Sequence, residues 1–566
     1  MHWTRHLGAT AGAALLVLLT AAPLASAVAG PDAPGAALPS APVCHPKDTA
    51  ADAKPGPAEA LLTGYGSGGF PITTRSAEAQ AYFDNGMQLA HAFAHRAAIS
   101  AFKRAVALDP ACAMCVWGEA WSRGPTINFD VPGKDTAELA VLADRAADLA
   151  RTGTDDERAL IAALQRRYHR GGGKGPGDLA FAAAMDAFAR AHPANNEAAV
   201  IAADAWMIPA ALNANRNHLA RARELLLATL QRDPDHTGAI HFYIHATEMD
   251  GVGTLALPYA EKLQARAPSA SHLVHMPSHT FLWAGRFRMA EQSHIDAVKI
   301  DRANAVRLKT RGGVFGLIYH AHNVQFGMAA ALLDNDADGG LFLAADEVAR
   351  LPEVKADDVY QQSVLGTAYF GYGRFADLAT VRALPDPGPR LPLDAALRQY
   401  AIGEAAARAG DVATLKAAIR AIPADPVVAP EIKDRVDRAQ AGALQTIARQ
   451  VLIGRAAMLE HRYAAAAEAY RTAAGVQDAH LGQERDPPVW WYPVRRSLAA
   501  ALLAEGNRDA ARRELATVLT WWPYDPVSLK LLADIEGTVG PANETRLQQA
   551  LSNWTGDIRT LPAALI

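Results

Sequence analysis

The segment QAYFDNGMQLAHAFAHRAAISAFKRAVALDPACA, residues 80–113, decides the fold. Small and aromatic side chains recur in it at the spacing of a helix-pair repeat of about 34 residues. These residues are Gly86, Ala98, Phe102, Ala105 and Pro110. Small residues let two helices approach closely, an aromatic ring fills the space beside the next pair, and proline ends the second helix. The segment therefore predicts one helix-turn-helix unit of a solenoid.

Weaker copies of this pattern follow along the chain. They lie at residues 222–234, 285–297, 366–375, 454–473 and 498–523. Alanine is abundant and runs of β-branched residues are rare, so the apolar pattern is helical almost everywhere. The sequence predicts an all-α fold, a tetratricopeptide-repeat-like (TPR-like) helical solenoid or superhelix with almost no strands.

The N-terminus has the order of residues found in a secretory signal peptide. Arg5 precedes an apolar stretch, and the small residues at 25–27 suit a cleavage site. Pro23 interrupts the apolar run before it reaches about 20 residues, the length needed to cross a bilayer. We expect residues 1–27 to be removed and the mature protein to be periplasmic or secreted, without a membrane span.

The rest of the chain divides by composition. Residues 28–57 are rich in Ala, Pro and Gly and are expected to form a flexible leader. We expect N-terminal repeats over 58–235, a His-rich central part over 236–340, and C-terminal repeats with a cap over 341–566. The net charge is −4 and Lys and Arg form no block, so nucleic acid is not an expected partner.

Histidine is concentrated in the central part, and its spacing there is typical of metal ligands. His241 and His245 are four residues apart and Glu248 follows three later, so all three share one face of a helix. His275 and His279 repeat the four-residue spacing. The other candidate ligands are His272, His320 and His322.

Equivalent helices of successive repeats stack side by side, so these histidines are predicted to converge on the concave face. Imidazoles gathered in one place suit Cu, Zn or Fe, which we take as the candidate cofactors. Each histidine alone could instead be a satisfied polar residue at a repeat interface. Three spaced clusters in consecutive units favour a metal site or a polar ligand pocket.

Two functions fit these features. In the first, the solenoid binds a protein, a peptide or a small molecule on its concave face, and the histidines supply polar contacts or hold a structural metal. In the second, the protein is a metal-dependent enzyme in which Glu248 or Tyr243 moves protons beside the metal. The motif His-Glu-x-x-His is absent, because Phe242 follows His241, and ordinary zinc proteolysis is therefore disfavoured.

Several strings resemble those of a family of large exported bacterial TPR proteins. They are residues 239–246 (AIHFYIHA), 272–279 (HLVHMPSH), 320–323 (HAHN) and 491–495 (WYPVR). The HMPSH string is specific, whereas the repeat positions are generic. The resemblance implies the solenoid fold and the importance of these histidines, but it names no reaction.

The three cysteines leave several pairings open. Cys112 and Cys115 are three residues apart at the start of a predicted helix, and Cys44 lies in the leader. A disulfide from Cys44 to one of the pair is the favoured arrangement. The pair could also act in redox chemistry, or serve as soft metal ligands together with His91 or His95.

Overall fold

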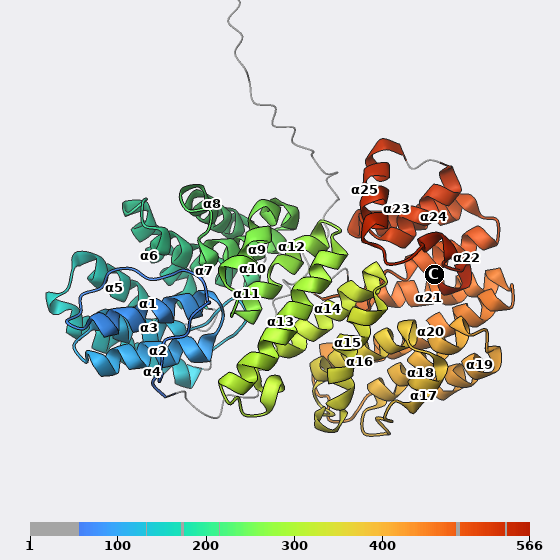
Figure 1. Ribbon diagram of the computed structural model, residues 1–566, viewed down its shortest axis with the longest axis horizontal. Helices are drawn as coiled ribbons and strands as arrows, with labels where there is room; N and C mark the ends of the chain where they lie inside the picture. The colour runs from blue at the N-terminus through green and yellow to red at the C-terminus, as the bar shows by residue number, and fades with distance from the viewer. Residues whose placement is uncertain (1–55, 132, 171–174, 214–215, 483–486, 538–539) are drawn as a thin grey trace, which may run out of the picture. The chain divides into compact units, whose positions relative to one another are not determined.

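The computed structural model describes residues 56–131, 133–170, 175–213, 216–482, 487–537 and 540–566. Over these ranges the regular elements are helices, with no strand. Successive helices pack against one another in the order of the sequence, beginning with α1 (Ala77–His91) on α2 (His95–Leu108) (Figure 1). The prediction of an all-α, TPR-like helical solenoid is confirmed.

The N-terminal helices show how the repeat pattern works. A Cβ atom added to Gly86 in α1 would lie 2.7 Å from a ring carbon of Phe102 in α2, so only glycine lets the ring fit there. Gly118 approaches the same ring from the third helix. The remaining helices of this part are α3 (Ala113–Ser122), α4 (Gly133–Leu149), α5 (Asp155–His169), α6 (Pro176–Ala191), α7 (Asn196–Asn213) and α8 (Arg216–Arg232).

The central helices carry most of the histidines. They are α9 (Thr237–Met249), α10 (Leu257–Arg266), α11 (Ser271–His275), α12 (Pro277–Trp283), α13 (Phe287–Arg307), α14 (His320–Asp334) and α15 (Ala337–Ala349). Pro277 stands at the start of α12, where its missing N–H costs nothing because that group would have no partner within the helix.

The C-terminal helices complete the array. They are α16 (Val359–Phe375), α17 (Leu378–Ala383), α18 (Pro392–Arg408), α19 (Val412–Ala421), α20 (Arg435–Leu459), α21 (Tyr463–His480), α22 (Arg495–Ala504), α23 (Arg508–Trp521), α24 (Pro526–Glu536) and α25 (Gly540–Asn553). Many of the helices begin at a side-chain cap. At α5, for example, the Thr154 hydroxyl accepts from the backbone N–H of Glu157, whose carboxylate accepts from that of Thr154. Such a cap stabilises a helix by about 1 kcal/mol.

The apolar core is divided into two large clusters of buried side chains. One extends along the chain from Tyr65 to Tyr319, and the other from Val298 to Ile566. The central helices belong partly to each cluster, and they bury imidazole rings where other repeats bury hydrocarbon. The candidate site therefore lies where apolar packing passes from one cluster to the next.

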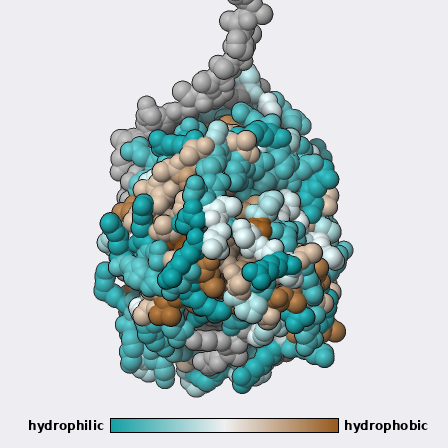
Figure 2. All heavy atoms as spheres, turned by 90° about the vertical axis from the view of Figure 1, so that its left-hand side faces the viewer, coloured by the Kyte–Doolittle hydropathy of each residue, from teal (hydrophilic) through white to brown (hydrophobic). Residues whose placement is uncertain are grey.

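The sequence predicts a mature protein without a membrane span and an N-terminal signal peptide. Within the described ranges, no helix is both long and apolar enough to cross a bilayer. The face seen in Figure 2 is mostly hydrophilic, with separated apolar patches. The predicted signal peptide, residues 1–27, lies outside the described residues, so export stays a prediction, as does the division of the repeats at 235 and 340.

Candidate metal centre

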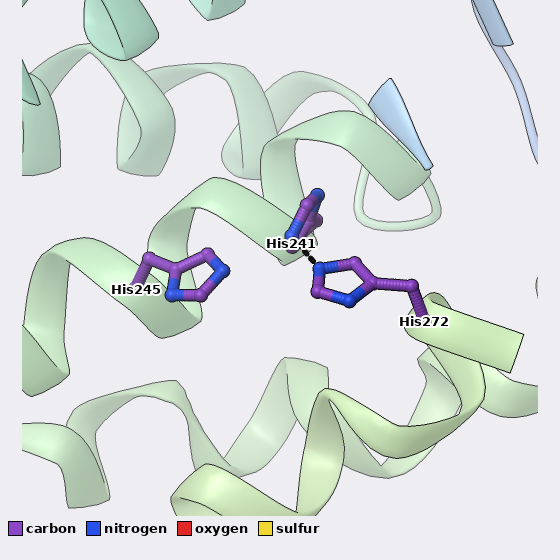
Figure 3. Close-up of side chains that lie close together, drawn as sticks. All are labelled: His241, His245 and His272. Atoms are coloured by element: carbon purple, nitrogen blue, oxygen red, sulfur yellow. Dashed lines mark hydrogen bonds between the residues drawn. The ribbon is translucent and has the colours of Figure 1, made fainter. Parts of the chain in front are cut away.

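The first group of histidines comes from α9 and α11. His241 and His245 are one helical turn apart on α9, and His272 extends toward them from α11 (Figure 3). One ring nitrogen of each lies within 4.8 Å of the other two. The Nε2 atoms of His241 and His272 are 3.1 Å apart, so the two rings are hydrogen-bonded to each other. We call these three residues the first triad.

The second group is built in the same way. His275 at the end of α11 and His279 on α12 are four residues apart, and His322 reaches them from α14. Their ring nitrogens also lie within 4.8 Å of one another, and the ring centroids of His275 and His322 are 5.1 Å apart. We call these three residues the second triad. Each triad thus joins a pair at i, i+4 to one histidine from a helix further along the chain.

Hydrogen bonds orient one ring in each triad. His241 Nδ1 lies 2.6 Å from the carbonyl oxygen of His91, and His279 Nδ1 lies 2.8 Å from a carboxylate oxygen of Glu248. A carbonyl or carboxylate oxygen only accepts, so Nδ1 carries the hydrogen and Nε2 keeps its lone pair. Ligand histidines in metalloproteins are held in this way, by a carbonyl or a carboxylate behind the ring.

The triads are enclosed by protein. The exposed fraction of each of the six side chains is 4% or less. Aromatic rings close over them: the Phe93 ring centroid lies 4.5 Å from that of His241 and 4.9 Å from that of His272. Phe93 adopts a φ of +52°, a conformation rare for a residue with a side chain, in the short turn between α1 and α2.

Burial fixes the charge of these rings. It lowers the pKa of His241 and of His322 to about 3, and it lowers the pKa values of His245, His272 and His275 well below the usual value for histidine. These five rings are therefore neutral at pH 7. Neutral imidazole is the form that binds a metal ion, so binding requires no loss of a proton from these side chains.

The structure brings together six of the seven predicted ligands. His320 does not join them: its Nδ1 lies 3.1 Å from Asp301, and its ring packs on Phe315. His320 and His322 are two residues apart on α14, about 200° around the helix, so they project to opposite sides. The rings are buried, and their predicted position on the concave face stays a prediction.

The two residues predicted to move protons lie in different places. Glu248 hydrogen-bonds His279, as a group that orients a ligand does. Tyr243 packs edge to face against Tyr259 of α10, with ring centroids 5.7 Å apart. It is two residues from His241 and projects from the opposite side of α9. Its proposed catalytic role stays a prediction.

Three residues around the triads were missed by sequence reasoning. His294 lies with its ring centroid 5.2 Å from that of His275, and its Nε2 is 2.7 Å from the Ser278 hydroxyl. His91 orients His241 from 150 residues away, and Phe93 covers the first triad. His294 has no partner at four-residue spacing, and the other two are distant in sequence, so no local signal could have found them.

The cysteines form a different bond from the expected one. Cys112 and Cys115 are joined by a disulfide within the first turn of α3. A bridge from Cys44 to either residue is therefore wrong, and Cys44 itself lies outside the described residues. Metal ligation by this pair is also wrong, because both sulfur atoms are in the disulfide.

Comparisons with known proteins add little beyond the fold. No protein-family model and no curated protein matches the chain. Among solved structures, the human IFIT1 dimer with m7Gppp-AAAA is 13% identical with a TM-score of 0.28, covering 85% of this chain and 91% of that chain. The APC/C hetero-tetramer Cut9-Hcn1 is 13% identical with a TM-score of 0.28, covering 81% and 76%. The TPR domain of P58(IPK) is 14% identical with a TM-score of 0.15, covering 60% and 94%.

Similarity this low carries no argument about function. The TPR-like fold rests on the chain's own helix packing, and membership of a particular exported family stays a prediction.

Proposed function

We propose that the protein binds a transition metal at the six buried histidines, and that the metal binds a small molecule. One observation carries the proposal: two sets of three buried imidazoles, each set with its nitrogens within 4.8 Å. Structural zinc sites use four protein ligands, whereas sites that bind water or substrate use three and leave a position open. Three histidines per set therefore favour a reactive or ligand-binding metal over a structural one.

Copper is the leading candidate for the metal, followed by zinc and iron. Both triads consist of imidazole alone, and imidazole suits Cu, Zn and Fe, whereas Mg, Ca and Mn prefer oxygen ligands. Among the divalent ions of the first transition row, Cu²⁺ binds a nitrogen site most tightly. Export, if residues 1–27 are a signal peptide, would place the site where extracellular or periplasmic metal reaches it.

The burial of the rings limits the size of the ligand. A side chain exposed by 4% or less cannot touch a folded partner, so the metal's ligand or substrate is a small molecule. A protein or peptide partner would bind elsewhere on the helices. An enzyme remains the second candidate function, because a metal with an open position can activate water or a bound oxygen ligand.

Metal analysis of the full-length protein tests this proposal. We expect near-stoichiometric Cu, Zn or Fe after purification or after loading with Cu²⁺, and a loss of at least tenfold in affinity in the double variant His241→Ala/His279→Ala. The matched control is His169→Ala/His192→Ala, which changes two surface histidines that pair with Asp144 and Asp156. A wild-type chain with full helical circular dichroism that takes up none of these metals would contradict the proposal.

A second measurement separates a ligand-binding metal from a structural one. Metal should raise the free energy of unfolding by about 4 kcal/mol at a free concentration 1,000 times its Kd, whatever its role. Only a metal with an open position also binds azide, which would appear as a new absorption band on the copper-loaded protein. A loaded protein that gains stability but takes up no azide would show that the metal is structural.

A further inference from the structure

The two triads lie next to each other. His272 of the first triad and His275 of the second are three residues apart on the short helix α11, and their ring centroids are 4.8 Å apart. On the other side, His245 of the first triad and His279 of the second have centroids 5.7 Å apart. The triads are therefore adjacent along two edges.

The repeat architecture explains this duplication. The first triad takes its i, i+4 pair from α9 and the second takes its pair from α11 and α12, and each takes its third histidine from a later helix in the array. Solenoid repeats place equivalent positions side by side. A histidine pair that occurs in two successive repeats therefore produces two neighbouring sites. Helix α11 belongs to both sites: its first histidine completes one triad and its last begins the next.

One ion cannot bind all six rings. Metal–nitrogen bonds are about 2.0–2.1 Å long, so two nitrogens on one ion are at most about 4.2 Å apart. Within each triad the nitrogens are close to this limit, but the six do not form one such set: they fall into two sets of three. Two ions are needed to use all of the rings.

The ring of His275 indicates that the second triad, like the first, lacks a binding partner. Its side chain is fully buried, and neither of its ring nitrogens has a hydrogen-bond partner among the described residues. The same holds for Nε2 of His245 and Nδ1 of His272. A buried polar atom without a partner destabilises the fold. A metal in each triad would supply partners for these ring nitrogens, which lie where the two triads meet.

Charge indicates what the two metals bind. Five of the six rings are neutral at pH 7, and the carboxylate of Glu248 hydrogen-bonds the sixth, that of His279, from behind. Two divalent ions would bring about four positive charges into a buried site, and buried charge is costly unless it is paired. A small anion between the ions would offset part of this cost.

We propose that the six histidines hold two like transition-metal ions side by side, three imidazoles each, with a small oxygen- or nitrogen-donor anion bridging them. This dinuclear centre rests on the proposed function, since it requires that the triads bind metal at all. The ligand class is a small anion such as hydroxide or azide, which enters the open positions of both ions together.

Copper loading of the full-length protein tests the dinuclear arrangement. We expect about two copper ions per chain and one azide per copper pair. The electron paramagnetic resonance signal of the oxidised protein should correspond to far less than two independent spins, because a bridge couples the ions. The variants His272→Ala and His322→Ala, each of which removes one ligand from one triad, should bind about half as much copper and give a full-intensity mononuclear signal.

The outcomes separate the two proposals. A wild-type chain that takes up no copper, zinc or iron would overturn both. One copper per chain, or two with the full intensity of independent spins, would overturn the dinuclear centre and leave metal binding intact. The wild-type measurements do not depend on any variant folding, and circular dichroism of both variants shows whether their copper content can be compared.

Discussion

Two buried ion pairs in the C-terminal helices and the two triads in the central helices satisfy their polar side chains differently. In the C-terminal helices, Arg455 lies 2.9 Å from Glu404 and Arg496 lies 2.7 Å from Asp525, and all four side chains are buried. Each charge meets its opposite within the protein. In the central helices, ring nitrogens of the triads face one another, and those of His275 meet no hydrogen-bond partner among the residues described.

The difference separates scaffold from site. A buried ion pair that is complete in itself specifies how helices pack and needs nothing from outside. A set of imidazoles whose ring nitrogens face one another is incomplete, and an added cation completes it. In these two regions, complete ion pairs therefore mark the scaffold, and a group of incomplete metal ligands marks the candidate site.

Breaking a scaffold pair should have the largest effect on stability. Arg455→Met leaves the Glu404 carboxylate buried without its guanidinium, and we expect the free energy of unfolding in urea to fall by about 3–5 kcal/mol. The double variant Arg455→Met/Glu404→Leu should recover part of this loss, because the Glu404 charge is gone, whereas the oxygens of Ala564 and Ile566 still lack the donor that Arg455 supplied. Copper uptake by the folded protein should not change in either variant.

The same variants test whether the two regions are independent. If Arg455→Met lowered copper uptake in proportion to its loss of stability, the C-terminal pair and the triads would be coupled, and the distinction between scaffold and site would fail.

A buried carboxyl in the central helices should show an intermediate effect that depends on pH. Glu347 in α15 is fully buried, and burial raises its pKa to about 7 from an unfolded value of about 4.5. The folded chain therefore holds this proton more tightly than the unfolded chain does. The group's contribution to stability is complete below pH 4.5 and is lost as the pH rises to about 7.

Glu347→Gln is neutral throughout this range and should flatten the dependence between pH 4.5 and 7. Above pH 7 the variant should be more stable than the wild type by up to about 3 kcal/mol, because the pKa of about 7 already includes the effect of Arg350 at 3.7 Å. Urea unfolding at pH 5 and pH 8 measures both numbers. A variant less stable than the wild type at pH 8 would mean that the charged pair with Arg350 stabilises the fold.

Much of the fold and part of the site could be predicted from local spacing. The repeat pattern around Phe102 places two helices, because the pattern is itself a packing rule between neighbours in sequence. The four-residue pairs on α9 and on α11–α12 are likewise local, since residues one turn apart share a face. These predictions succeed because the contacts that carry them are short in sequence.

The rest of the site depends on contacts that spacing does not encode. His320 and His322 look alike as a sequence pattern, yet one pairs with Asp301 and the other completes the second triad. The carbonyl of His91 reaches His241 from 150 residues away. The depth of the site was missed for the same reason, because the turn that carries Phe93 closes over helices that are distant in the chain.

The smallest expected effect concerns the group behind one ligand. The Glu248 carboxylate fixes the ring of His279 so that Nε2 is directed into the second triad. Loss of such a group weakens metal binding about 10- to 100-fold, which corresponds to about 1.4–2.7 kcal/mol. We expect this loss in Glu248→Ala and a smaller one in Glu248→Gln, because the amide oxygen can still accept from Nδ1 but lacks the charge. The control is Glu261→Ala, which removes a surface carboxylate paired with Arg286.

Copper titration should show the weakening at one of two sites. Glu248 contacts a ligand of the second triad, while the ring of His241 in the first triad is held by the carbonyl of His91. Equal weakening at both sites would mean that the triads bind as one unit, and no weakening would remove Glu248 from the centre.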